Sequence, residues 1–334
     1  MPVLPITHRP GVHCASTGLR DLAAFHGLDW SEAMCFGLGA GLGIWYLSLP
    51  GLSPSRMVHV RSADIEEQFF TRIGVDFNWS EFDDPARSEA ALMEALDAGL
   101  PALIQTDIFH LPYYGSRTHF PGHVVVVWGY DVRRRVFTVT DTERPAPLEV
   151  GFDDLRRARY FSGGLFESRG RMFAPARLTP PADMAGCLRQ ALTANSRALL
   201  RPSWPGSGLP GLRLWRADLE TWPKLEDGPW CARFAYQVIE KRGTGGGGFR
   251  TLYAAFVREA VAWWPELADA AARMASLAEA WSRLAEACRV VSEDAAWNLA
   301  ALAGSLERVS SLETDYHRWI DAWGLKPPHD KESA

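Results

Sequence analysis

Two kinds of hydrophobic pattern divide this chain. In its first half, short runs rich in β-branched residues alternate with amphipathic segments. Beyond Asp183 the apolar residues recur at helical spacing within Ala-, Leu- and Glu-rich segments, and the consecutive prolines of RLTPPAD precede this change. The sequence therefore predicts an α+β domain over residues 1–178, followed by an all-α helical domain over residues 183–334.

Within the first domain, apolar residues at helical spacing predict a short amphipathic helix that begins after Cys14 and stops at Gly27. Further helices are predicted over 64–73 and 85–99, and strands over 56–61, 101–106, 123–130 and 135–141. Another helical segment begins at Ser31 and runs into GLGAGLG at 37–43. Because a dinucleotide-binding loop needs GxGxxG between a strand and a helix, this order excludes a Rossmann fold.

In the second domain the periodicity predicts only helices and no internal repeat. A Pro- and Gly-rich loop is expected at 202–211, and GTGGGGF forms another at 243–249. The predicted helices cover 183–200, 216–241, 249–263, 266–290 and 293–322.

Composition narrows the class of protein. Hydrophobic residues make up 47% of the 334 residues, charged residues make up 22%, and the net charge is -5. This charge gives no reason to expect a nucleic-acid partner. The chain shows neither a secretion signal at its start nor an apolar segment long enough to cross a membrane, so a cytoplasmic location is expected. The five cysteines contain no CxxC pair, and we expect four of them to be inert buried thiols.

The remaining cysteine, Cys14, is a candidate nucleophile. It opens a predicted helix, His123 begins a predicted strand, and Asp141 ends the next strand. The order of cysteine, histidine and acid is that of papain-like enzymes. Asp141 would orient the imidazole of His123, which would exchange a proton with Cys14. Taken singly, the three could equally be a buried thiol, a strand histidine and a turn residue; together they favour acyl chemistry.

An oxyanion hole needs a second donor besides the nucleophile's own backbone N–H. Papain-like enzymes commonly place a glutamine shortly before the cysteine, but this chain has His8, Arg9 and His13 there. His8 or His13 could supply the donor, or could be loop residues in contact with solvent.

Several linked motifs resemble one known family. The segments HRPGVHCASTGLRDLAAFHG, SEAMCFGLGAGLG and DIFHLPYYGSRTHFPGHVVVVWGYD, with the strand ending in Asp141, resemble the N-terminal domain of the butirosin biosynthesis protein H family. The helical half, with VIEKRGTGGGGFRTLYAAFVREA, is similar to the uncharacterised domain that often follows it.

The resemblance implies a papain-like acyltransferase of antibiotic-like biosynthesis. Such an enzyme takes an acyl group from an acyl carrier protein's phosphopantetheine thioester and passes it to an amine of a small molecule. Cys14 would carry the acyl group, His123 would be the acid and base, and Asp141 the orienting residue. No cofactor is expected, because exchange between thioesters needs neither ATP nor a metal.

Other residues are weaker candidates for substrate binding. A predicted loop between two core strands carries Asp107, His110, Tyr113 and Tyr114, which would hold an amine or hydroxyl-rich acceptor or simply pack in the loop. Arg250 follows the glycine-rich loop and would approach a phosphopantetheine arm, unless that loop is only a turn between helices. His110, His119 and His123 do not predict a metal site, because Pro121 and Gly122 preclude a helix that would align the last two, and the pattern supplies no cysteine or carboxylate.

Two alternatives to the acyltransferase are left open by the residues. The same three residues would serve a cysteine peptidase or amide hydrolase. A catalytically silent protein that retains the fold to bind a carrier protein is the third possibility.

Overall fold

The computed structural model describes residues 3–49, 51–163, 166–294 and 297–326. The chain forms two compact units. The first unit comprises residues 1–35 and 66–182, and the second comprises 36–65 and 183–334.

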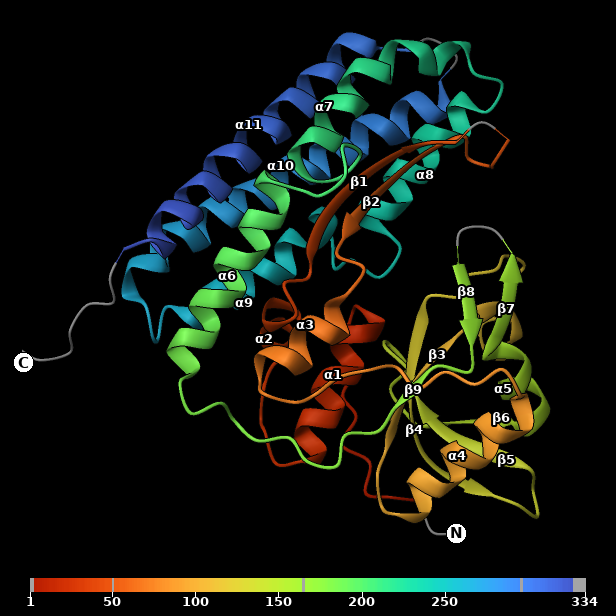
Figure 1. Ribbon diagram of the computed structural model, residues 1–334. Coiled ribbons are helices and arrows are strands. Elements are labelled where there is room, and N and C mark those ends of the chain that lie inside the picture. Colours follow the sequence, from red (N-terminus) through yellow and green to blue (C-terminus); the bar gives the residue numbers. More distant parts are fainter. Residues whose placement is uncertain (1–2, 50, 164–165, 295–296, 327–334) are drawn as a thin grey trace, which may run out of the picture. The chain divides into compact units, whose positions relative to one another are not determined.

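The first unit contains an antiparallel five-stranded sheet with the strand order β6-β5-β4-β3-β9 (Figure 1). Its strands are β3 (Ala102–Thr106), β4 (His123–Asp131), β5 (Val136–Thr140), β6 (Leu148–Gly151) and β9 (Met172–Phe173), and a separate hairpin is formed by β7 (Tyr160–Gly163) and β8 (Phe166–Arg169). Its helices are α1 (Cys14–Phe25), α4 (Pro85–Asp97), α5 (Phe152–Ala158) and the 3-10 turn η1 (Ile108–His110). Two helices cross the boundaries between the units, α2 (Glu32–Leu38) and α3 (Ile65–Arg72).

Helix α1 lies against the sheet, where it packs on β4. Its apolar residues Leu19 and Leu22 are fully buried. At Gly18 the helix comes so close that a Cβ atom would lie 2.8 Å from Leu103 Cδ1. A larger residue at this position would require Leu103 to move, so glycine allows α1 to lie close to β3. The opposite part of the core is built by α4, α5 and the alternating residues of β3, β4 and β5.

In the part of the second unit that the structure describes, all elements are helical except one hairpin of β1 (Leu42–Ser48) and β2 (Arg56–Arg61). Figure 1 shows the long α10 and α11 side by side in blue. The helices are α6 (Met184–Leu200), α7 (Gly208–Asp218), α8 (Gly228–Glu240), α9 (Arg250–Ala260), α10 (Ala268–Glu293) and α11 (Leu299–Gly324), with 3-10 turns η2 (Leu219–Lys224), η3 (Gly247–Phe249) and η4 (Pro265–Leu267).

The α+β class expected from the sequence is confirmed, with a sheet-containing part followed by a helical part. The organisation differs at residues 36–65, which the sequence placed in the first domain and which belong to the second unit. The side chain of Asn195 on α6 explains part of this difference. It accepts from the backbone N–H of Leu42 at 3.2 Å and donates to the carbonyl of Leu42 at 2.7 Å, so it acts as a strand partner for β1.

One predicted helix, 216–241, is divided in the structure. Pro223 lies inside η2, and α8 begins only at Gly228. Proline lacks the N–H that an α-helix needs at an interior position, so the chain tightens into a 3-10 turn there. Helix α7 instead begins at Gly208, within the predicted loop 202–211. Among the helices described, none combines the length and the apolar character needed to cross a membrane.

Candidate active site

Cys14 is the first residue of α1 and is partly exposed. His13 caps the helix, and its Nδ1 accepts the backbone N–H of Ser16 at 3.4 Å. The first turn of a helix presents backbone N–H groups without intrahelical partners, and their dipoles stabilise an anion. A thiolate at Cys14 would therefore lie at the favourable end of α1.

His123 and Asp141 lie together because their strands are antiparallel neighbours. His123 is the first residue of β4, and Asp141 directly follows β5. The imidazole Nε2 of His123 lies 2.9 Å from each carboxylate oxygen of Asp141. A side-chain hydrogen bond also joins His123 to Cys14. Since Nε2 is occupied by Asp141, Nδ1 is the ring nitrogen that remains for the thiol.

The charges around His123 favour the protonated form of its ring, an imidazolium. Burial opposes a charged ring, but the negative Asp141 and its hydrogen bond, together with Cys14, raise the pKa of His123 to about 10. Burial would likewise raise the pKa of Asp141, but the imidazolium and the hydrogen bonds from His123, Tyr113 and Thr142 lower it. A protonated His123 beside Cys14 is an arrangement that would stabilise a thiolate at neutral pH.

The hydroxyls of Tyr113 and Tyr114 bind Asp141 and do not face an open surface. The hydroxyl of Tyr113 donates to Asp141 Oδ2 at 2.6 Å, and that of Tyr114 donates to Oδ1 at 3.3 Å. Thr142 adds a further hydrogen bond to Oδ1 at 2.8 Å. The sequence proposed both tyrosines as substrate ligands, but their hydroxyls are engaged by the carboxylate. They therefore act on the site by orienting Asp141.

Glu32 positions the segment before Cys14, a role that no motif in the sequence indicates. The carboxylate of Glu32 accepts the backbone N–H groups of Val12 at 3.0 Å and His13 at 2.9 Å. It also accepts the hydroxyls of Ser16 and Thr17 at 3.0 and 3.2 Å. The only signal in the sequence is an acidic residue in the first turn of α2, which by itself indicates a helix start.

Replacing Glu32 by glutamine is expected to lower the free energy of unfolding by about 1–2 kcal/mol. An amide has one acceptor oxygen, and its NH₂ group would face backbone donors. Chemical denaturation measures the change, and Cys14 should also be alkylated with altered kinetics. The exposed Glu67 provides a matched control, since Glu67→Gln alters a carboxylate in the first turn of α3. Equal stability of the two variants would contradict a positioning role for Glu32.

His8 is not available to donate to an oxyanion. Its Nδ1 lies 2.5 Å from Asp21 Oδ2, and its Nε2 lies 2.8 Å from the carbonyl oxygen of Arg144. Both partners can accept hydrogen bonds, which favours a proton on each ring nitrogen. Burial works against this charge, but the hydrogen bond and charge of Asp21 raise the pKa of His8. His8 therefore holds the N-terminal segment in place, and His13 caps α1.

Asp107 also differs from its predicted role, because it is completely buried. Its Oδ1 accepts the backbone N–H groups of Phe109 and Phe120 at 3.1 and 2.8 Å. Its Oδ2 lies 2.5 Å from His119 Nδ1. His110 is partly exposed nearby. Asp107 organises the loop before β4 and offers no open surface to an acceptor.

Arg250 is not a surface ligand for a phosphopantetheine arm, because its side chain is 0% exposed. The guanidinium pairs with Glu313 at 2.7 Å inside the second unit. The glycine-rich loop before it is explained by packing as well: a Cβ at Gly247 would lie 2.8 Å from the carbonyl oxygen of Ala278, and its φ of 58° favours glycine. Both features therefore have structural explanations.

The other thiols differ from Cys14 in their surroundings. Cys35, Cys231 and Cys288 are buried, and burial raises the pKa of Cys288 to about 12. Burial also raises the pKa of Cys231. Cys187 is partly exposed, contrary to the expectation that all four would be buried. It provides an internal comparison for the reactivity of Cys14.

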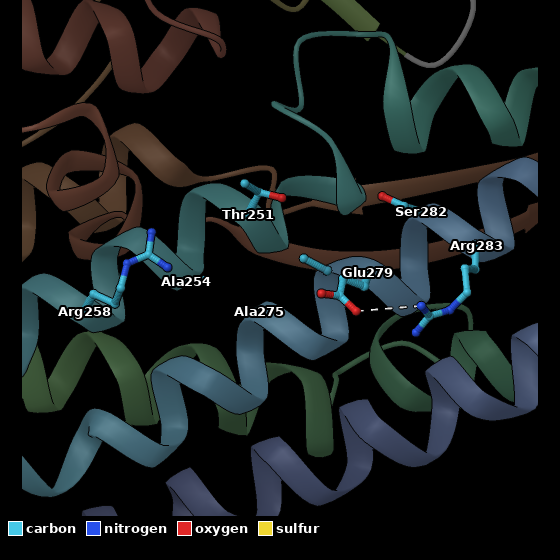
Figure 2. Close-up of a pocket in the computed structure, with 8 residues that line it drawn as sticks. Thr251, Ala254, Arg258, Ala275, Glu279, Ser282 and Arg283 are labelled. Carbon is cyan, nitrogen blue, oxygen red and sulfur yellow. Dashed lines mark ion pairs between the residues drawn. The ribbon is translucent and has the colours of Figure 1, made fainter.

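The second unit has a pocket of about 340 Å³ between α9 and α10 (Figure 2). Exposed charged side chains surround it, including Arg258, and Glu279 pairs with Arg283 at 3.7 Å. Exposed ion pairs of this kind contribute little to stability. None of the proposed catalytic residues lines this pocket; its lining residues are Thr251, Ala254, Arg258, Ala275, Ala278, Glu279, Ser282 and Arg283.

Comparison with known families agrees with the resemblance seen in the motifs. Residues 13–142 match the profile "Butirosin biosynthesis protein H, N-terminal", and residues 153–320 match "Domain of unknown function (DUF4872)". A search of curated proteins found no match. The first match contains Cys14, His123 and Asp141, and the family takes its name from an antibiotic biosynthesis protein. The chain therefore belongs to the family in which the N-terminal domain of butirosin biosynthesis protein H is followed by the DUF4872 domain.

Proposed function

We propose that the protein is a cysteine-dependent acyltransferase of antibiotic-like biosynthesis. It takes an acyl group from the phosphopantetheine thioester of an acyl carrier protein and passes it to an amine of a small molecule. The observation that carries the proposal is the chain of contacts from Cys14 to His123 and on to Asp141. The family name, which refers to an antibiotic biosynthesis protein, supports a role in biosynthesis.

The first half-reaction forms an acyl-enzyme. The Cys14 thiolate attacks the thioester carbonyl, and the carbon–sulfur bond to phosphopantetheine breaks as the new one forms. His123 gives its proton to the departing thiolate. One thioester replaces another, so the step is nearly balanced in free energy and needs no ATP.

The second half-reaction forms an amide. The acceptor amine attacks the acyl-enzyme carbonyl while His123, now neutral, takes a proton from the nitrogen. The Cys14 thiolate then leaves, and the imidazolium again stabilises it. Asp141 keeps one tautomer and one ring orientation throughout, because Tyr113, Tyr114 and Thr142 fix its oxygens.

We expect iodoacetamide to alkylate Cys14 rapidly well below the pH of about 8.5 at which an ordinary thiol ionises. The imidazolium that stabilises the thiolate persists until the pH approaches the His123 pKa of about 10. In His123→Ala the rapid reaction at low pH should disappear. Mass spectrometry assigns the label to individual cysteines, and Cys187 serves as the internal reference. If Cys14 and Cys187 titrate alike in both proteins, no activated thiolate exists.

A second assay separates transfer from its alternatives. The protein is incubated with a carrier protein that bears an acyl-phosphopantetheine, with and without an amine, and intact-mass analysis follows the acyl group. The proposal predicts an acyl adduct on Cys14 that is converted to an amide when the amine is present. Release of the free acid at an amine-independent rate would favour a hydrolase. Binding of the carrier protein without any adduct would favour a silent binding protein.

A further inference from the structure

A carboxylate and two imidazoles meet in the first unit, outside the group of Cys14, His123 and Asp141. Asp107, His110 and His119 each offer one ligand atom, and these atoms lie within 4.8 Å of one another. Asp107 directly follows β3, His110 ends η1, and His119 lies in the loop before β4. The sequence pattern did not reveal this set, because nothing in the spacing assigns Asp107 to the histidines.

The surroundings of Asp107 are those of an oriented ligand. Two backbone N–H groups bind its Oδ1, which turns Oδ2 toward His119. Ligand carboxylates in metal sites are commonly held in this way by outer hydrogen bonds. The ring of Phe109 stacks on His119 at 4.2 Å, and that of Phe161 lies 5.0 Å from it. Two aromatic rings therefore pack against His119.

We propose that Asp107, His110 and His119 bind a zinc ion. One carboxylate and two imidazoles form a ligand set that Zn²⁺ accepts, with a fourth position left for water or another ligand. Zinc lies about 2.0–2.2 Å from such atoms, so the Asp107–His119 contact of 2.5 Å has to open. The His119 side chain is 44% exposed and can make this movement. The proton that His119 Nδ1 shares with Asp107 is released to solvent, and the zinc ion occupies its position.

A zinc ion at this site would connect the two ends of the loop between β3 and β4. Asp107 and His119 bracket the segment that contains Tyr113 and Tyr114, whose hydroxyls hold Asp141. Zinc would tie the two ends of this segment together and so restrict the motion of both tyrosines. The binding itself depends on neither Cys14 nor acyl transfer, and it can be tested separately from the proposed function.

The test is a zinc titration of the full-length protein by competition with a chromophoric chelator. Cys14→Ala protein is used beside the wild type, so that zinc binding by the Cys14 thiol can be excluded as the source of the signal. We expect one zinc per chain in both proteins and loss of this stoichiometric binding in His110→Ala and in His119→Ala. The control is His26→Ala, which changes a histidine outside the cluster and should leave binding intact. Circular dichroism checks that each variant is folded.

Cobalt(II) gives an independent readout, since nitrogen and oxygen ligation in a four-coordinate site produces visible absorption. That absorption should appear in Cys14→Ala and vanish in His119→Ala. Three outcomes would overturn the proposal: no saturable zinc binding, binding that survives both histidine variants, or binding that disappears only with Cys14. The last would assign the metal to the thiolate.

Discussion

Replacing Cys14 by alanine is expected to abolish acyl transfer, with a loss of about 10⁴- to 10⁶-fold in turnover. No acyl-enzyme forms without the sulfur, so the protein cannot exchange its thioester with the carrier. The measurement is amide formation from an acylated carrier protein, together with the mass of the enzyme. The fold should be unaffected, because Cys14 is partly exposed at the start of α1.

Substitutions of His123 and Asp141 should reduce turnover to different degrees. His123→Ala removes the proton carrier and should reduce turnover nearly as much as loss of the nucleophile, since the two act as a unit. Asp141→Asn should reduce it by about 10⁴-fold, because an amide can stabilise the wrong imidazole tautomer. Residual labelling of Cys14 in that variant would separate a tautomer defect from a loss of structure.

Cys187→Ala is the matched control, since it removes the other partly exposed thiol. Its turnover should equal that of the wild type. Wild-type turnover in Cys14→Ala would refute the covalent mechanism. In that case a carrier-binding role without chemistry would become the better interpretation.

The local sequence pattern is sufficient to predict Cys14, His123 and Asp141 as the candidate site. The helix after Cys14 and the two valine-rich strands are legible in the sequence, and antiparallel pairing of those strands brings His123 within 2.9 Å of Asp141. What the sequence could not specify is which polar side chains meet each other. Tyr113 was expected to hold substrate but binds Asp141, and Glu32 was overlooked because its partners lie in a separate segment.

Local sequence patterns likewise predict individual helices but not the contacts between segments that are distant in sequence. Periodicity located α9 and α10 to within a few residues, because each buries one apolar stripe. It did not reveal that residues 36–65 join the second unit, since that choice depends on Asn195 and Arg250, which are distant in sequence. Arg250 illustrates the difficulty: an arginine after a glycine-rich loop is typical of anion binding, yet here its partners are internal.

Arg250 is the centre of a buried polar network in the second unit. Its guanidinium donates to Glu313 at 2.8 Å and to the carbonyl oxygens of Val60 and Gly248 at 3.1 and 2.6 Å. The other polar contacts of Glu313 come from Trp281 at 2.6 Å and His317 at 2.8 Å. Burial would raise the pKa of Glu313, but Arg250 and these donors lower it to about 2. The carboxylate is therefore ionised in the folded protein.

Arg250→Met is expected to destabilise the protein by about 3–5 kcal/mol, because it leaves a buried carboxylate without its main counter-charge. Chemical denaturation measures the loss. Arg258→Met, on the exposed face of the same helix, should change the stability by less than about 0.5 kcal/mol. The double variant Arg250→Met/Glu313→Leu should recover much of the loss, since it removes both charges. Equal destabilisation in the single and double variants would mean that shape, not charge, determines the effect.

The pH dependence of stability tests whether the ion pair between Arg250 and Glu313 causes this loss. The folded pKa of Glu313, about 2, lies below its ordinary value of 4.5. Its contribution to stability is therefore complete above about pH 4.5 and is lost as the pH falls toward 2. In Arg250→Met the carboxylate should regain a higher pKa and bind a proton more readily. The stability difference between wild type and variant should consequently be largest at neutral pH and shrink in acid. A difference that does not change with pH would show that the ion pair with Glu313 is not its cause.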